Sequence, residues 1–134
     1  MTEPVLLAGF DAGQTHTTCR LALRRSDGSL QVLAEGDGPG VSHLAAAAGE
    51  ERFTAALTIS LERARAAATH SSEGLALTTS LQAAVVGASG IEQGSAVQQL
   101  GTALAAAALG LPLQRVLVSG DECTALNGAF GGRP

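Results

Sequence analysis

Lysine, tryptophan and tyrosine are absent from this chain of 134 residues, and three phenylalanines supply its aromatic side chains. Without lysine the chain cannot form a Schiff base, and it cannot bind phosphate through a P-loop lysine. Its basic residues are eight arginines that do not form a cluster, and the net charge is −4 at pH 7. An acidic chain of this kind repels nucleic acid, so we expect no nucleic-acid partner.

Cysteine is scarce as well, because Cys19 and Cys123 are the two that the sequence contains. They lie too far apart to predict a metal site, and two reduced thiols are what a cytoplasmic protein is expected to carry. The longest apolar tract is mostly alanine and is too short to span a bilayer, and the polar N-terminus does not resemble a signal peptide. We therefore expect a cytoplasmic protein with no membrane partner, folded as a single domain over residues 1–134.

The apolar pattern predicts five strands and three helices in the order β-β-β-α-β-α-β-α. Phe53, Leu57 and Leu61 mark the buried face of the first helix, which begins at Ser42 or at Gly49. Strands are expected at 5–10, 18–23, 30–34, 82–87 and 115–119. An irregular glycine-rich loop is expected at 35–40. A second helix is expected at 96–109 with Gly110 at its end, and a third helix begins at residue 121.

This order predicts one mixed sheet. Two antiparallel reversals make the third strand parallel to the first, and right-handed crossovers make the fourth and fifth parallel to it too. The expected strand order is third, second, first, fourth, fifth, with helices on both faces. The stretches 11–17, 36–40, 87–90 and 119–122 then open onto one edge. Ligands of open α/β sheets bind outside the carboxyl ends of the strands, so we expect the site at this edge.

The stretch DAGQTHT at 11–17 is the first candidate site. Gly13 is expected to reverse the chain through backbone angles closed to other residues. The turn then exposes backbone N–H groups and hydroxyls beside the Asp11 carboxylate, which suits a phosphate chain and its magnesium ion. The alternative is an ordinary hairpin whose Asp and Thr residues stabilise the turn.

Four motifs taken in order resemble one family. They are GFDAGQTHT at 9–17, GDGPGVSHL at 36–44, VVGASGIEQGS at 85–95 and VLVSGDECTALNGAFGG at 116–132. The chain resembles the N-terminal lobe of the BadF/BadG/BcrA/BcrD-type ATPases, and within them the N-acetylglucosamine-kinase-like proteins. These belong to the actin, hexokinase and Hsp70 superfamily, so the resemblance implies a ribonuclease-H-like α/β fold.

The resemblance also implies an ATP-dependent phosphotransferase that acts on N-acetylglucosamine or a related amino sugar, with ATP and Mg²⁺ as cofactors. The roles it implies are Mg²⁺ binding for Asp11, phosphate binding for Gly13, Gln14, Thr15 and Thr17, general-base catalysis for Asp121, and sugar binding for Gly38, Pro39, Gly40 and Ser89. The chain departs from the family at Ala12, Gln14 and His16, where Gly, Gly and Lys are commoner, and at Val41 and Ser42, near where such kinases often carry an Asn. The family continues into a C-terminal lobe, so we expect this lobe to be completed by a second lobe or by a homo-oligomer.

Other functions compete with this one. A protein-activating ATPase of the same family needs cysteines that bridge two subunits around an iron–sulfur cluster, and Cys19 and Cys123 do not lie in such a pattern. A non-catalytic fragment is a further alternative. A ribonuclease-H-type nuclease needs several acids around two metals, and the fourth strand ends in residues that carry none. Asp121 alone also fits a plain helix N-cap.

Overall fold

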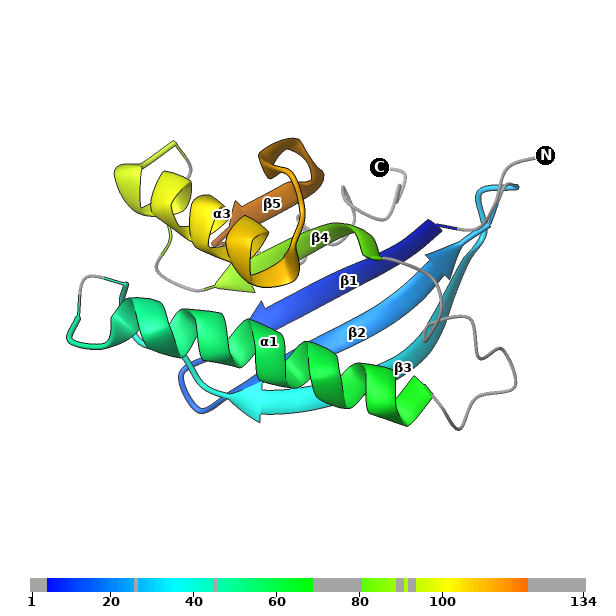
Figure 1. Cartoon of the computed structure of the whole chain (residues 1–134), viewed down its shortest axis with the longest axis horizontal. Helices are drawn as coiled ribbons and strands as arrows, with labels where there is room; N and C mark the ends of the chain where they lie inside the picture. The colour runs from blue at the N-terminus through cyan, green and yellow to red at the C-terminus, as the bar shows by residue number, and fades with distance from the viewer. Residues whose placement is uncertain are drawn as a thin grey trace.

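The computed structural model describes residues 5–25, 27–44, 46–68, 81–88, 91 and 94–120. Its elements, shown in Figure 1, are β1 (Val5–Ala12), β2 (His16–Arg24), β3 (Leu30–Pro39), α1 (Gly49–Ala68), β4 (Leu81–Ala88), α3 (Ala96–Leu109), the 3₁₀ turn η1 (Leu113–Arg115) and β5 (Val116–Ser119). Within these residues no helix is both long and apolar enough to cross a membrane. Ser89, Asp121 and the predicted third helix lie outside the described residues.

The five strands form one sheet in the order β3-β2-β1-β4-β5. β1 and β2 pair antiparallel, as do β2 and β3, whereas β1 with β4 and β4 with β5 pair parallel. This strand order and these directions are the predicted ones, and they make the domain a ribonuclease-H-like α/β fold. β1, β3, β4 and β5 all end at the same edge of the sheet, which we call the carboxyl edge (Figure 1).

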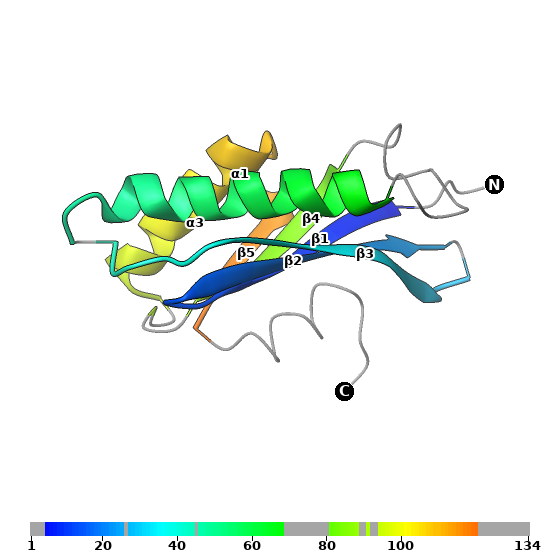
Figure 2. The same ribbon diagram turned by 90° about the horizontal axis from the view of Figure 1, so that it is seen from below.

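Both described helices cover the same face of the sheet, as Figure 2 shows. Alternate strand residues point toward them, and Phe10, Leu21 and Val86 are fully buried there with Phe53 and Leu57 of α1. Folding removes the apolar surface of these side chains from water, and this burial is the main contribution to the stability of the domain. We call the opposite side of the sheet the far face. Because side chains alternate along a strand, Asp11 is on the far face.

β3 is longer than the sequence predicts. The stretch 35–40 was expected to be an irregular loop, but the strand runs on through Gly36 and Gly38 to Pro39. The reason is packing: a Cβ at Gly36 would fall 2.6 Å from the Ser60 carbonyl oxygen and 2.7 Å from the Arg63 carbonyl carbon. The missing side chains let the backbone of α1 lie directly on the strand. The prediction of a loop was wrong because glycine weakens an isolated strand but here allows a close helix contact.

Both ends of α3 follow ordinary capping rules. α1 begins at Gly49 and not at Ser42. α3 spans the predicted 96–109; the Ser95 side chain accepts a hydrogen bond from the Gln98 N–H, and Gly110 ends the helix with φ 69°. A left-handed residue after a helix favours glycine, as the sequence indicated.

Candidate functional site

The β1–β2 turn lies at the carboxyl edge and has a two-residue tip. The Gly13 N–H donates to the His16 carbonyl oxygen at 3.0 Å, which leaves Gln14 and Thr15 as the connection. Both side chains are exposed. Positive φ angles in the described residues occur at Gly28, Gly94, Gly110 and Ala48 and not at Gly13. The expectation that Gly13 reverses the chain through special backbone angles was therefore wrong, because the reversal takes place at the tip.

This turn is fixed to the segment that follows β3. The Val41 N–H donates to the Gly13 carbonyl oxygen at 2.9 Å. Gly40 packs so closely on the turn that a Cβ there would lie 2.5 Å from the carbonyl carbon of Gln14 and 2.8 Å from that of Thr15. The turn predicted to bind phosphate and the end of the segment predicted to bind the sugar, at 38–40, thus pack directly against each other. Within the described residues, the N–H groups of Gln14 and Thr15 have no hydrogen-bond partner.

Asp11 is exposed beside this turn, at the end of β1. Its cross-strand neighbours are Thr18 on β2 and Gly87 on β4. Gly87 carries no side chain, so the β4 neighbour contributes only backbone next to the carboxylate. β1 and β4 are the strands between which the chain order of the sheet reverses, and clefts at such points are where ligands of α/β folds bind. Asp11 therefore lies at the edge of the sheet where the sequence predicts the site.

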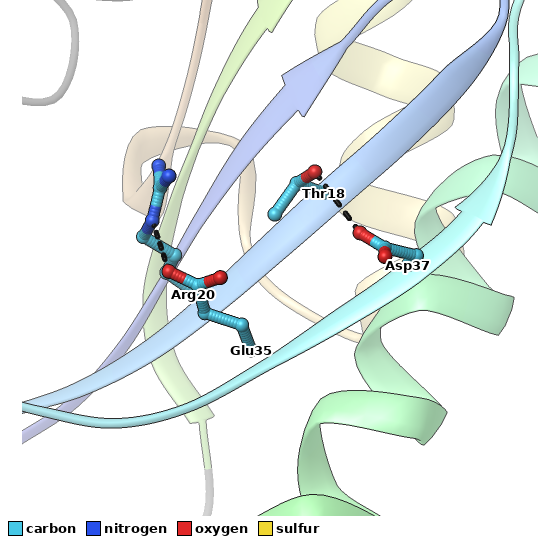
Figure 3. A network of polar contacts seen from close by, with 4 residues as sticks. All are labelled: Thr18, Arg20, Glu35 and Asp37. Carbon is cyan, nitrogen blue, oxygen red and sulfur yellow. Dashed lines mark hydrogen bonds and ion pairs between the residues drawn. The ribbon is translucent and has the colours of Figure 1, made fainter.

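A row of polar side chains continues from Asp11 across the far face, and sequence reasoning missed it. Thr18 lies opposite both Asp11 and Asp37, and its hydroxyl donates to Asp37 Oδ1 at 3.1 Å (Figure 3). In the next row, Arg20 Nε donates to Glu35 Oε2 at 2.7 Å. The two-residue tip at Gln14 and Thr15 fixes only the pairing of Asp11 with Thr18. The pairs with Asp37 and Glu35 depend on the β2–β3 turn and on the register shift between Leu21 and Ala22, which the sequence does not reveal.

Thr17 does not suit its predicted role. Its side chain is fully buried on the helix-covered face, and its hydroxyl oxygen has no hydrogen-bond partner within the described residues. A phosphate at the surface of the turn cannot reach a hydroxyl in that position. Alternation along β2 explains the placement, since Thr17 points to the same side as the buried Cys19.

The predicted sugar-binding residues have different surroundings. Gly38 is buried against α1, where a Cβ would meet Ser60 N at 3.0 Å and Ala56 O at 3.1 Å, so it packs against the helix. Gly40 is buried against Gln14, and Pro39 is exposed at the end of β3. Of these three, Pro39 is the residue whose side chain a ligand at the edge could contact.

A small cavity lies at the same edge, beneath the starts of the two helices. Its lining is mostly apolar and comprises Val41, Ser42, His43, Leu44, Phe53, Ala88, Ile91 and Val97. Its volume is about 20 Å³. The Ser42 hydroxyl is buried there without a partner in the described residues. A cavity of this size holds about one water molecule, which the Ser42 hydroxyl could bind, so it is too small for a sugar.

The ionisable groups of the described residues do not gather into a ready-made metal centre. No group of three or more His, Cys, Asp or Glu side chains that could hold a metal ion occurs within residues 5–25, 27–44, 46–68, 81–88, 91 and 94–120. Burial raises the pKa of the Cys19 thiol to about 12, against a smaller lowering by the charge of Arg65. Metal ions bind the thiolate, which is therefore strongly disfavoured at this position.

Comparison with known proteins leaves the family open. No protein-family model matches the chain, and no curated protein matches it. Among solved structures it is similar to T. thermophilus RuvC in complex with a Holliday junction substrate, at 15% sequence identity and a TM-score of 0.38, over 97% of this chain and 81% of that one. The assignment of the fold rests on the strand order and directions described above.

Proposed function

We propose that the chain is the N-terminal lobe of an ATP-dependent sugar kinase that acts on N-acetylglucosamine or a related amino sugar. The observation that carries the proposal is the arrangement at the carboxyl edge. There the exposed Asp11 lies beside a turn that is hydrogen-bonded to Val41 and whose Gln14 and Thr15 N–H groups have no acceptor in the described part of the chain. A carboxylate and unpaired backbone donors are the two kinds of group that a magnesium-bound phosphate chain requires.

Asp11 fits a magnesium ion. A hard cation prefers carboxylate oxygens, and Mg²⁺ commonly keeps several waters and takes one or two carboxylates together with phosphate oxygens. Its bare Gly87 neighbour on β4 leaves that side of Asp11 free of a competing side chain. When bound, Mg²⁺ would neutralise charge on the phosphates. Gln14 and Thr15 would hold the phosphate oxygens, and Asp121, which lies outside the described residues, would accept the proton of the sugar hydroxyl.

The burial of Cys19 favours the kinase over the protein-activating ATPase. An iron–sulfur cluster that bridges two subunits needs accessible thiolates. The Cys19 side chain is fully buried within β2 and its pKa is raised to about 12, so it is neither accessible nor ionised at neutral pH. Cys123 alone would give one ligand from each subunit, which is too few to hold such a cluster.

Titration calorimetry with ATP, in the presence and absence of Mg²⁺, tests the proposal. We expect the chain to bind ATP more tightly with Mg²⁺, and Asp11→Asn to weaken Mg²⁺-dependent binding about tenfold or more, which corresponds to about 1.4 kcal/mol. The matched control is Asp27→Asn. Asp27 is an exposed carboxylate in the β2–β3 turn at the opposite edge, and an amide oxygen there can still accept the Ser29 N–H.

Sugar binding is measured in the same calorimetric experiment, by adding N-acetylglucosamine or glucosamine to the complex of the chain with Mg²⁺ and ATP. Binding of nucleotide without either sugar would retain the nucleotide site and reject the sugar kinase. Equal losses in Asp11→Asn and Asp27→Asn would show a general charge effect and would contradict the role of Asp11. A chain that binds no nucleotide would overturn the proposal as a whole.

A further inference from the structure

The far face of the sheet carries buried apolar side chains that neither described helix covers. Leu7 is 2% exposed, Ala22 0% and Val85 1%. The strand register pairs Leu7 with Ala22 and sets Val85 beside Gly9, and alternation along β1 puts them on the same side as Asp11. These three apolar side chains do not belong to the cluster under α1 and α3, which lie on the other side of the sheet (Figure 2). We call the three residues the far-face patch.

Neighbouring side chains in the sheet are too small to bury this patch. Val85 has Gly9 as its neighbour on β1, which carries no side chain, and Ala83 and Gly87 as its neighbours along β4. The side chain of a strand residue stands roughly perpendicular to the sheet, so neighbours of this size leave its tip uncovered. Leu117, the neighbour on β5, is itself 41% exposed. A further part of the chain therefore lies over the patch.

The cover belongs to the same copy of the chain, because the patch is buried within a single copy. Two stretches of more than four residues lie outside the described residues, 69–80 and 121–134. The first joins the end of α1, on the helix side, to the start of β4, and both of these points lie at the edge opposite the carboxyl edge. Its two ends are therefore fixed away from the far face. The second is attached at one end only.

The stretch 121–134 follows β5 at the carboxyl edge, where the helix side is already occupied. There Gly101 of α3 lies against Val118, and Gln98 donates from Nε2 to the Val118 carbonyl oxygen at 2.8 Å. The far face is the side of the sheet that α1 and α3 leave open to the chain beyond β5.

The sequence of this stretch suits an apolar cover. Leu126 and Phe130 are four residues apart, and residues at this spacing share one face of a helix. The ten residues 121–130 would measure about 15 Å as a helix. The row of Leu7 lies four strand residues, or about 13 Å, below the row of Ser119 at the carboxyl edge. The stretch is therefore long enough to reach across the whole patch.

We propose that residues 121–131 dock on the far-face patch, with Leu126 and Phe130 over Leu7 and Val85. The apolar side chains of both partners then leave water together, which is the driving force of the contact. The packing is independent of the kinase function, because it rests on the burial of the patch and not on nucleotide binding.

Docking also fixes where the stretch begins. Asp121 follows Ser119 by two residues, and Ser119 lies in one row with Gly87 and Asp11. A stretch that is held on the far face keeps its first residue at the carboxyl edge, which is the edge that carries Asp11.

Nuclear Overhauser effects in the unmodified chain test the contact directly. We expect cross-peaks between the ring protons of Phe130 and the methyl groups of Leu7 and Val85. Cross-peaks from Leu75 or Leu77 to these methyl groups, in place of Phe130, would assign the cover to 69–80 and overturn the proposal. A patch without cross-peaks to any residue of 121–131 would overturn it as well.

A fluorescence measurement tests whether the patch holds the stretch in place. The chain contains no tryptophan, so Phe130→Trp introduces a single reporter. We expect acrylamide to quench this indole several-fold less in the folded chain than in urea. Adding Leu7→Ala should raise the quenching in the folded chain toward the value in urea, because it removes part of the patch.

Leu6→Ala is the matched control. Leu6 precedes Leu7 in β1, is 0% exposed and belongs to the cluster on the helix side, so its truncation removes the same atoms from the opposite face. It should leave the quenching of the indole low at a temperature where circular dichroism shows both variants to be folded. Equal quenching in the Leu6→Ala and Leu7→Ala chains would contradict docking on the far face.

Discussion

Replacing Gly36 by alanine tests how closely α1 lies on β3. Gly36 is buried in the strand, and a Cβ there would lie 2.6 Å from the Ser60 carbonyl oxygen and 2.7 Å from the Arg63 carbonyl carbon, with the Ala64 nitrogen closer still. All three are backbone atoms of the helix. A flexible side chain could rotate away from such a contact, but the backbone of a hydrogen-bonded helix cannot. The helix or the strand must therefore shift.

The expected cost follows from this geometry. Overpacking a core typically costs about 1–3 kcal/mol, and a clash with several backbone atoms belongs at the upper end. A glycine replaced by alanine without strain would instead stabilise by roughly 0.4–1 kcal/mol through the unfolded chain. We therefore expect Gly36→Ala to lower the unfolding free energy by about 2–3 kcal/mol. For a domain of this size that lowers the melting temperature by roughly 6–15 °C.

Gly101→Ala is the matched control. Gly101 is buried in α3, and a Cβ there would make ordinary contacts with Val118 at 3.4 Å and with Ile91 and Leu44 at 3.6 Å. Alanine is the better helix former by about 1 kcal/mol, so this variant should be as stable as the wild type or more stable. Urea and thermal unfolding followed by circular dichroism measure both changes. A Gly36→Ala variant as stable as Gly101→Ala would refute the close seating of α1 on β3.

Two further predictions concern buried groups on β2. Thr17→Val should raise the unfolding free energy by about 1–2 kcal/mol in urea denaturation, because it removes a buried hydroxyl without a partner. The same variant should leave Mg²⁺–ATP binding unchanged. A loss of that binding would restore Thr17 to the phosphate site. Cys19 stays protonated in the folded chain up to a pKa of about 12, whereas it ionises near 9.0 when unfolded, so the unfolded state binds fewer protons above pH 9. Stability should therefore decline between about pH 9 and pH 12 and should decline less in Cys19→Ala, and equal pH profiles for the two chains would contradict this account.

The overall fold could be predicted from the sequence because its main signals are local. Apolar alternation gave the first two strands, and their directions and the crossovers determined the order of all five. Gly110 marked the end of α3 because a left-handed residue there favours glycine. β3 was predicted too short, since strand propensity describes an isolated strand and contains no information about a helix that packs on it.

The candidate site was predicted less completely, for two physical reasons. Asp11, Gln14 and Thr15 are exposed at the expected edge, because strand order alone determines where β1 ends. Thr17 was assigned to phosphate by its place in a motif, although the period of a strand already put it on the buried side with Cys19. Where a motif and the strand period disagree, the period is the stronger guide, because a one-residue shift would turn the whole strand over.

The glycines of β3 connect the packing of the core to the site. Gly36 and Gly38 alternate along the strand on the side that meets α1, and Gly40 follows at the same spacing and meets Gln14. The pattern G-x-G-x-G therefore describes one bare side of an extended segment, over which first a helix and then the phosphate turn come close. Val41, which follows Gly40, is hydrogen-bonded to the Gly13 carbonyl oxygen. A shift of β3 away from α1 therefore also moves the backbone that holds the turn. The position of the Gln14 and Thr15 N–H groups thus depends on how α1 packs on β3, although α1 contributes no residue to the turn itself.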